Sequence, residues 1–370
     1  MGSDVTLVIV VGTALAFDFT NGFHDTANVI ATSISTRAMA PRIAVAYASL
    51  LNFAGAFISQ AVAATVAKDV VRLAPDPHAL LIVFGGLVGA IAWNLVTWYF
   101  GLPSSSSHAL IGGVVGAVFL AEGADAIHGD GLLGKVMVPA LVAPTLAFLV
   151  AGLAILVVYR IVGRLRPGPV SRSFRAGQVL SGGLLALAHG TNDAQKTMGV
   201  MTLALIANGT ISQSHFHVPD WVVISAASAI ALGTYAGGWR IIRTMGSRIH
   251  KMDSAQGFAA QGAGAAVILT SSHVGFPLST THTISGAVIG SGAAKRLSAV
   301  RWGVAGNIVL AWILTLPAAA AMGGAVYGVT RAFGTGPAGP IVVCGLILAG
   351  AAALFARRAA RGPAATAAGA

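Results

Sequence analysis

Four short motifs gather the side chains of this 370-residue chain that could do chemistry. Two of them place a carboxylate among amides, GFHDTAN at 22–28 and HGTNDAQK at 189–196. The other two place hydroxyls before a histidine, PSSSSH at 103–108 and PLSTTH at 277–282. Carboxylate and amide oxygens are ligands for hard cations, and hydroxyls can donate to an anion. Each half of the chain holds one motif of each kind in the same order, which predicts one ion site built from two equivalent parts.

The carboxylates Asp25 and Asp193 hold matching places in the first pair of motifs, and both lie within apolar stretches. An ionisable group in such surroundings is costly enough to suggest a function, although a paired structural carboxylate is the alternative. We expect the two aspartates to bind a coupling cation, which could be a metal ion. The candidates for the coupling-ion site are Asp25, Asp193, Asn21, Asn28, Asn192 and His24, and the candidates for a metal are Asp25 and Asp193.

Other ionisable side chains near the motifs each admit two roles. Lys196 stands three residues after Asp193, so it could neutralise that carboxylate across one helical turn or contact the substrate. His24 adjoins Asp25, and histidine is the side chain best suited to carry a proton at physiological pH. Asp18 has no counterpart in the second half, so a structural role stays open for it. We expect His108 and His282 to orient the breaks before their helices, and His78, His128, His215, His217 and His250 to lie solvated in loops.

The hydroxyl runs precede short apolar segments, so each is expected at the N-terminus of a helix. Free N–H groups and the positive end of the dipole make such a terminus an anion site, and hydroxyls add neutral donors. Capping of a buried helix end is the plainer explanation. Nearby carboxylates would repel an anion, so the anion and a cation should bind together. The candidates for substrate binding are Ser104, Ser105, Ser106, Ser107, Ser279, Thr280, Thr281, Asp25, Asn28, Asn192, Gln195 and Lys196.

The elements that must position these motifs are membrane helices. Hydrophobic residues make up 56% of the chain, charged residues 9%, and the mean hydropathy is +0.81. A soluble domain has roughly 25% charged residues. A helix needs about 20 apolar residues to cross the bilayer. The apolar stretches are 5–31, 43–67, 79–101, 109–121, 136–159, 177–207, 221–239, 258–273, 283–294, 302–328 and 339–356. We therefore predict an all-α polytopic membrane protein with broken helices.

Two stretches, 109–121 and 283–294, are too short to cross and follow the hydroxyl-rich breaks. We predict that each forms a re-entrant hairpin with its predecessor, because non-helical backbone at membrane depth survives only inside protein or against water. Both halves then run helix, helix, hairpin, helix from opposite sides, which is an inverted repeat. The predicted divisions are a first repeat at 1–160, a cytoplasmic linker at 161–176, a second, inverted repeat at 177–328, and a further helix and tail at 329–370.

The loop charges set the orientation. Placing the loop at 160–175 in the cytoplasm puts the loops at 32–42, 240–257 and 295–301 and the C-terminus there as well. These segments hold 17 of the 22 Lys and Arg residues. The outer loops hold four, Lys68, Arg72, Lys135 and Arg331. We expect a multi-pass protein of the inner cell membrane with its N-terminus outside and its C-terminus in the cytoplasm.

Several classes of function fit the chain poorly. The formal charge of +11 is spread over short loops, whereas nucleic-acid binding needs a basic face, so we expect a lipid and not a nucleic-acid partner. The single cysteine, Cys344, excludes an intramolecular disulfide and a multi-cysteine metal site. A cation channel would need rings of carboxylates. A hydrolase using Ser107 and His108 would pair adjacent residues without a G-x-S-x-G elbow. No enzyme activity or cofactor is expected, and a homo-oligomer stays open.

The strings FDFTNGFHDTANVIAT, SSSSH, AHGTNDAQKTMG and STTHTISGAVIG, in this order, resemble the inorganic phosphate transporter (Pit) family, and within it the bacterial low-affinity transporters. The likeness covers nearly the whole chain. It implies symport of inorganic phosphate with a cation through two inverted repeats, each with a G-x-N-D motif and a hydroxyl-rich hairpin. The family's essential aspartates fall on Asp25 and Asp193, and its hairpin serines fall on Ser105 and Ser279.

The sequence departs from this pattern at His24, which stands where the family motif has Asn. The change weakens any Na⁺ site that depends on that amide. The bacterial branch implies coupling to protons and transport of phosphate with a divalent metal, so we expect protons. A Na⁺-coupled phosphate symporter and a carrier of another tetrahedral oxyanion, such as sulfate, are the alternatives. Monohydrogen phosphate can donate a hydrogen bond and sulfate cannot, so an acceptor such as Asp25 favours phosphate.

Overall fold

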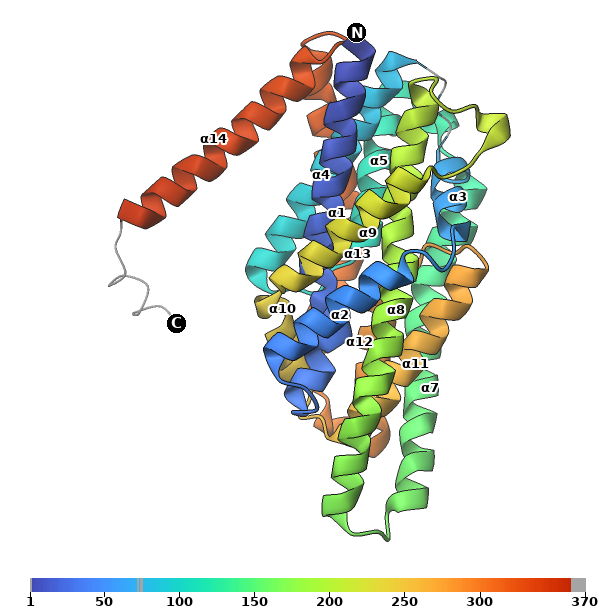
Figure 1. The fold of residues 1–370 in the computed structure, drawn as a ribbon, viewed down its shortest axis with the longest axis vertical. Coiled ribbons are helices and arrows are strands. Elements are labelled where there is room, and N and C mark those ends of the chain that lie inside the picture. The colour runs from blue at the N-terminus through green and yellow to red at the C-terminus, as the bar shows by residue number, and fades with distance from the viewer. Residues whose placement is uncertain (1, 72, 74–75, 361–370) are drawn as a thin grey trace.

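The computed structural model describes residues 2–71, 73 and 76–360, and its regular structure there is helical, apart from one isolated β-bridge between Val71 and Ile127 (Figure 1). The all-α prediction is confirmed. Arg72 and the tail at 361–370, which entered the prediction of orientation, lie outside the described residues.

The helices follow the order of the apolar stretches. The first half contains α1 (Gly2–Ser35), α2 (Pro41–Gly55), α3 (Ala61–Lys68), α4 (Pro77–Phe100), α5 (Ser106–Glu122), the short α6 (Gly129–Gly131) and α7 (Val138–Val162). The second half contains α8 (Pro167–Ala207), α9 (Asp220–Ala236), α10 (Trp239–Arg243), α11 (Ser254–His273), α12 (Thr280–Lys295) and α13 (Trp302–Arg331). The last helix is α14 (Ala338–Ala360). π-Helical turns at Leu132–Met137 and Thr244–Arg248 lead into α7 and extend α10.

By length and composition alone, four described helical segments could cross a membrane: Gly2–Ser35, His78–Phe100, Gly129–Val162 and Trp302–Arg331. The pair Asp220–Ala236 and Trp239–Arg248, bent by 59°, would be a fifth. The predicted stretch at 221–239 therefore ends in a bend, which Gly237 permits with its φ of 75°.

The predicted stretch at 43–67 is also wrong as a single helix, because the chain leaves the helical path between α2 and α3. The side-chain oxygen of Gln195 accepts hydrogen bonds from the backbone N–H groups of Val62 and Ala63. These donors at the start of α3 therefore have a partner from another helix, which allows α3 to begin anew inside the protein.

The packing of the helices is consistent with an inverted repeat. Helix α1 packs on α9 as α8 packs on α2, and α1 and α8 contact each other. Helices α4 and α5 pack on α13, while α11 and α12 pack on α7. Each hairpin of one half is thus supported by the final helix of the other half.

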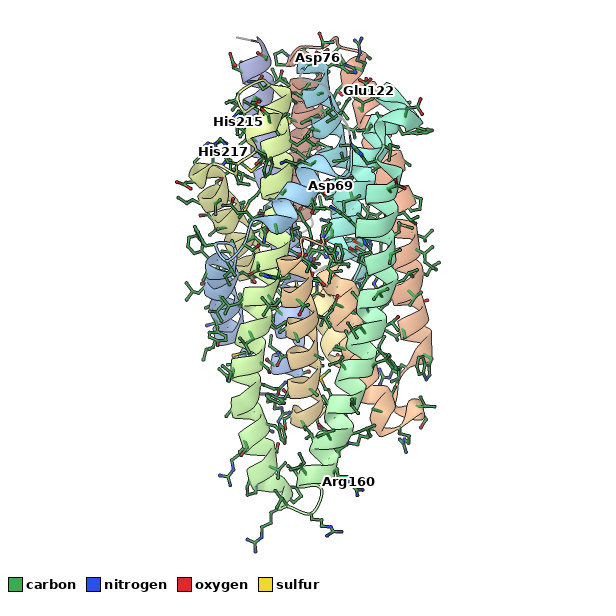
Figure 2. All side chains as sticks on the ribbon, turned by 90° about the vertical axis from the view of Figure 1, so that its right-hand side faces the viewer. Asp69, Asp76, Glu122, Arg160, His215 and His217 are labelled. Carbon is green, nitrogen blue, oxygen red and sulfur yellow. The ribbon has the colours of Figure 1, made fainter. Side chains whose placement is uncertain are left out.

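The ends of the bundle differ in charge. Asp76, Glu122, His215 and His217 lie near one end, and Arg160 lies at the opposite end (Figure 2). This arrangement agrees with the sidedness expected from the loops. Helix α14 leaves the bundle at an angle (Figure 1), and its Leu346, Ile347 and Leu348 side chains are exposed.

Glycines allow the central helices to approach closely. A Cβ atom on Gly22 would lie 2.3 Å from the carbonyl oxygen of Ile230, and one on Gly233 would lie 2.1 Å from that of Phe19. The α8–α2 contact has the same arrangement at Gly190, whose added Cβ would lie 2.1 Å from the carbonyl oxygen of Asn52. Since the obstructing atoms are backbone, a side chain at these positions must push the helices apart.

Gly190→Ala should destabilise the protein by about 1–3 kcal/mol, because the new methyl group overpacks the contact between α8 and α2. Thermal unfolding in detergent measures the effect. Gly262→Ala is the matched control, since an added Cβ there has nothing within 4 Å. Equal stability of the two variants would show that α8 and α2 leave room for a methyl group at Gly190.

Candidate functional site

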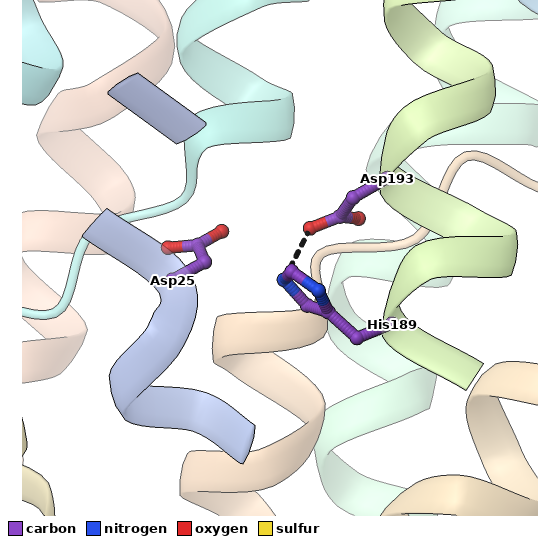
Figure 3. A group of neighbouring side chains, drawn as sticks. All are labelled: Asp25, His189 and Asp193. Carbon is purple, nitrogen blue, oxygen red and sulfur yellow. Dashed lines mark ion pairs between the residues drawn. The ribbon is translucent and has the colours of Figure 1, made fainter. Parts of the chain in front are cut away.

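Asp25 on α1 and Asp193 on α8 face each other at the centre of the bundle (Figure 3). Both are buried. Ligand atoms of Asp25, Asp193 and His189 all lie within 4.8 Å of one another. The structure therefore brings together the two carboxylates that the sequence placed 168 residues apart.

The two carboxylates have different partners. Asp25 Oδ1 lies 2.6 Å from His24 Nδ1 and accepts from the Thr281 hydroxyl at 3.3 Å. Asp193 pairs with the Lys196 ammonium through Oδ1. The other oxygen of Asp193 lies 3.0 Å from His189 Nε2 and accepts from Thr280 at 3.0 Å. Asp193 is thus paired with a lysine, whereas the ion-pair partner of Asp25 among the described residues is a histidine.

Three buried amides surround the aspartates with unused acceptor oxygens. The Oδ1 atoms of Asn21, Asn28 and Asn192 have no hydrogen-bond partner among the described residues. The nitrogen of Asn28 donates to Thr281 at 2.8 Å, and that of Asn192 donates to Ser272 at 2.8 Å, so both oxygens are held in place. Buried acceptors without donors fit a bound cation, because carbonyl oxygens are its ligands.

The tips of the two hairpins meet beside the aspartates. Helix α5 begins at Ser106 and α12 at Thr280. Ser107 donates to the Leu278 carbonyl at 3.1 Å, and the rings of His108 and His282 are 4.7 Å apart. Two helix N-termini, each with its positive dipole end, therefore converge on the centre.

The hydroxyls divide into two groups. Ser105 and Ser279, the serines that the resemblance singles out, accept from the backbone N–H groups of His108 and His282 at 3.1 and 3.2 Å and so cap their helices. Capping explains one serine in each hairpin.

The remaining hydroxyls contact the ionisable groups. Ser104 Oγ lies 3.4 Å and Ser106 Oγ 3.5 Å from nitrogens of His24. Thr280 and Thr281 reach the two aspartates, and Ser107 accepts from Lys196 Nζ at 2.5 Å. The hydroxyls that capping does not use therefore belong to the central cluster.

Crossed contacts join the halves. Asn28 of the first half donates to Thr281 in the second hairpin, and Lys196 of the second half donates to Ser107 in the first. Asn28 stands three residues after Asp25 as Lys196 stands three after Asp193, so the two contacts are equivalent. Each aspartate-bearing helix is thus tied to the opposite hairpin.

The structure gives Gln195 a role that the sequence did not indicate, and it contradicts the expectation for His250. The side chain of Gln195 contacts the start of α3, as described above, and donates to the Thr191 carbonyl, so a contact with substrate stays a prediction. His250 is 2% exposed, and neither of its ring nitrogens has a hydrogen-bond partner among the described residues. A position in a loop did not imply exposure, because α12 packs against this ring at Gly292.

The structure also identifies residues that sequence reasoning gave no role or left open. His189 precedes Asp193 by one helical turn, and this i, i+4 spacing was the available signal. Asp18 is fully buried, and neither carboxylate oxygen has a hydrogen-bond partner among the described residues. Its polar neighbours are Thr197 and Asn21. An unpaired buried carboxylate is costly, so a proton or another cation fits there.

Comparison with known proteins identifies the family. Residues 21–323 match the profile of the phosphate transporter family. A probable low-affinity inorganic phosphate transporter of Mycobacterium tuberculosis (strain ATCC 25618 / H37Rv) is 51% identical over 351 residues, which are 95% of this chain and 84% of the relative. A protein of the same description from Bacillus subtilis (strain 168) is 41% identical over 327 residues, 87% of this chain and 96% of the relative.

A solved structure shares the fold. The structure described as the sodium-dependent phosphate transporter superposes with a TM-score of 0.78 at 25% sequence identity, covering 88% of this chain and 99% of that one. The resemblance found from the motifs is confirmed, since the matched residues include both aspartates and both hairpin tips. This chain belongs to the phosphate transporter family.

Proposed function

We propose that this protein carries inorganic phosphate across the membrane by symport with cations, and that the carried ions bind between the two hairpin tips. The observation that carries the proposal is the charge of the buried centre. Among the described residues, Asp18, Asp25 and Asp193 are buried there with one lysine, Lys196. With neutral histidines the centre is negative, so an anion can enter only if cations enter with it.

The hairpin tips supply the attraction for the anion. The N-termini of α5 and α12 provide N–H groups and dipoles, and the hydroxyls of Ser106, Ser107, Thr280 and Thr281 add donors. These donors are neutral, so phosphate can leave again. Asp25 favours phosphate over sulfate, since a carboxylate can accept the proton of monohydrogen phosphate. The names of the relatives, which describe phosphate transporters, support this substrate.

Two cations suit the centre for different reasons. His24 beside Asp25 could carry a proton, which supports proton coupling. The unused oxygens of Asn21, Asn28 and Asn192 suit a metal ion, and the structural relative is described as sodium-dependent. Phosphate accompanied by a divalent metal at Asp25 and Asp193 would satisfy the same oxygens. We favour protons because His24 stands before Asp25 where the second half has Asn192 before Asp193. This histidine removes an amide that a Na⁺ site would use and adds a group that can carry a proton.

The expected setting is the inner cell membrane, with the end near Arg160 in the cytoplasm. The basic loops at that end support this orientation. Alternating access would move each hairpin with the final helix of the other half, since these elements pack together. The contacts of Asn28 with Thr281 and of Lys196 with Ser107 would then change when ions bind.

Purified protein in liposomes should accumulate labelled phosphate when a proton gradient is imposed. Asp193→Asn should reduce uptake to the level of empty liposomes, because the variant lacks the carboxylate that we expect to bind the coupling cation. Sulfate in place of phosphate is the substrate control. Uptake that ignores pH and requires Na⁺ would contradict proton coupling, and near-normal uptake by the variant would remove Asp193 from the mechanism.

His24→Asn should shift coupling from protons towards Na⁺. The variant gives Asp25 the amide neighbour that Asp193 already has in Asn192. Initial uptake rates measured with and without Na⁺ at two pH values test this change. If the variant keeps the pH dependence of the parent protein, His24 does not carry the proton.

Lys196→Met should destabilise the protein by about 3–5 kcal/mol, because it leaves the Asp193 carboxylate buried without its cation. The double variant Asp193→Asn with Lys196→Met should recover most of this loss and remain inactive in transport. Thermal unfolding in detergent and phosphate uptake separate the two effects. A stable single variant would show that Lys196 does not neutralise Asp193.

A further inference from the structure

A cavity of about 590 Å³ opens at the end of α1 remote from the N-terminus. Its wall includes Arg37, Arg175, Lys251 and Arg301, which come from four separate segments of the chain. None of these four side chains forms an ion pair or side-chain hydrogen bond with another described residue. The cavity therefore presents four unpaired cations in a concave surface.

The one carboxylate in this wall is already engaged. Asp253 accepts from the Gln256 backbone N–H at 2.9 Å, the Tyr159 hydroxyl at 2.8 Å and Lys295 Nζ at 3.2 Å. Burial raises the pKa of Asp253, but these hydrogen bonds outweigh burial and hold it below its usual value. Asp253 thus stays charged, and its oxygens are occupied by these three donors. The four cations therefore remain free to bind another anion.

Buried polar side chains connect this cavity with the central site. Thr36 lines the cavity and donates to Gln178 at 2.6 Å. One turn closer to the centre, Gln261 donates to Ser33 at 2.7 Å and accepts from Ser181 at 3.1 Å. The Thr32 hydroxyl, one turn after Asn28 on α1, has no hydrogen-bond partner among the described residues. Polar groups therefore extend from Asn28 to the cavity along α1, α8 and α11; we call these residues the polar track.

The equivalent positions on the other side of the site are apolar. Aligning Asp25 with Asp193 pairs Gln178 with Val10 and Ser33 with Met201. Aligning His108 with His282 pairs Gln261 with Leu87.

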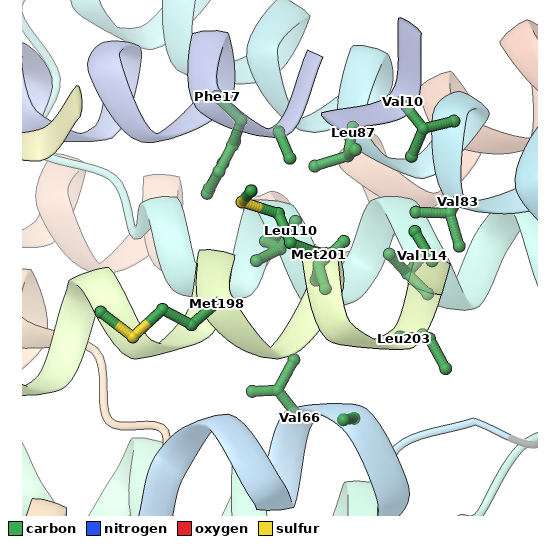
Figure 4. Close-up of a cluster of buried hydrophobic side chains, with 14 of the residues drawn as sticks. Val10, Phe17, Val66, Val83, Leu87, Leu110, Val114, Met198, Met201 and Leu203 are labelled. Atoms are coloured by element: carbon green, nitrogen blue, oxygen red, sulfur yellow. The ribbon is translucent and has the colours of Figure 1, made fainter. Parts of the chain in front are cut away.

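Val10, Met201 and Leu87 lie together in one buried hydrophobic cluster, with Phe17 and Leu110 (Figure 4). Thr13, the counterpart of Ser181, keeps a hydroxyl, which donates to its own helix at Ile9. The site is thus lined by apolar side chains on the side of Val10, Leu87 and Met201, and by polar side chains on the side of the cavity.

We propose that the cavity formed by Arg37, Arg175, Lys251 and Arg301 is a second, low-affinity oxyanion site, at which phosphate leaving the central site along the polar track pauses before release into the cytoplasm. This inference rests on the proposed function and adds an exit site to it. Inorganic phosphate is the ligand because exposed cations and hydroxyls bind a mobile dianion without enclosing it.

The sidedness of membrane loops would by itself gather basic residues at this end. It does not require that four of them line one cavity, or that buried polar residues lead to that cavity. Arg160 lies at the same end (Figure 2), Arg164 follows it in the connection between α7 and α8, and neither belongs to the cavity wall. They provide a control with the same change in charge.

The test compares the double variant Arg175→Gln with Arg301→Gln against the control Arg160→Gln with Arg164→Gln. Initial rates of labelled phosphate uptake into right-side-out and inside-out membrane vesicles give the KM at each face. The first variant should raise the KM at the cytoplasmic face about fivefold, as expected for two exposed charge contacts, and leave the outer KM unchanged. Size-exclusion chromatography confirms that both variants are folded.

Ionic strength gives a second measurement on the unmodified protein. Raising it to about 0.5 M should raise the KM at the cytoplasmic face more than at the outer face, because exposed charges are screened. An unchanged cytoplasmic KM in the first variant, an equal rise in the control, or an equal rise at both faces would overturn the exit site. Absence of phosphate uptake by the unmodified protein in either orientation would instead refute the proposed function.

Discussion

In the part of the chain that the structure describes, three carboxylates and one lysine are buried at the centre of the bundle, and the rest of the structure depends on how their charges are balanced. Charge in such a place is tolerated only if it is paired or neutralised. Lys196 forms an ion pair with Asp193, but neither Asp25 nor Asp18 forms an ion pair with a lysine or arginine among the described residues. The converging N-termini of α5 and α12 bring a positive field to the same place without adding a fixed charge. The centre is thereby suited to mobile ions of both signs.

The same centre joins the two halves mechanically. Asn28 and Lys196 reach across to the opposite hairpins, and each hairpin rests on the final helix of the other half. An ion that binds between the tips therefore contacts parts of both halves at once. A change in occupancy can then bias the arrangement of the whole bundle, which is what coupling of two bound ions requires.

Symmetry of the backbone does not extend to the side chains. The glycine contacts at Gly22 and Gly190 are nearly equivalent, because both halves need the same close approach of helices. The surroundings of the central site differ between its two sides, since Val10 and Met201 in one half stand where Gln178 and Ser33 stand in the other. Val10 and Met201 belong to a buried hydrophobic cluster, whereas Gln178 and Ser33 take part in hydrogen bonds between helices.

The class of fold, the family and the central pair of aspartates could all be predicted from the sequence. Apolar stretches of membrane length, charges confined to loops and the four motifs in repeated order are local properties, and a local pattern can be detected in the chain without coordinates. How side chains distant in sequence combine became known from the three-dimensional structure. It directed Gln195 to α3, placed His189 on Asp193, buried His250 and gathered Arg37, Arg175, Lys251 and Arg301 around one cavity. Such outcomes depend on which faces of separate helices meet, and residue type and spacing along one helix do not specify that.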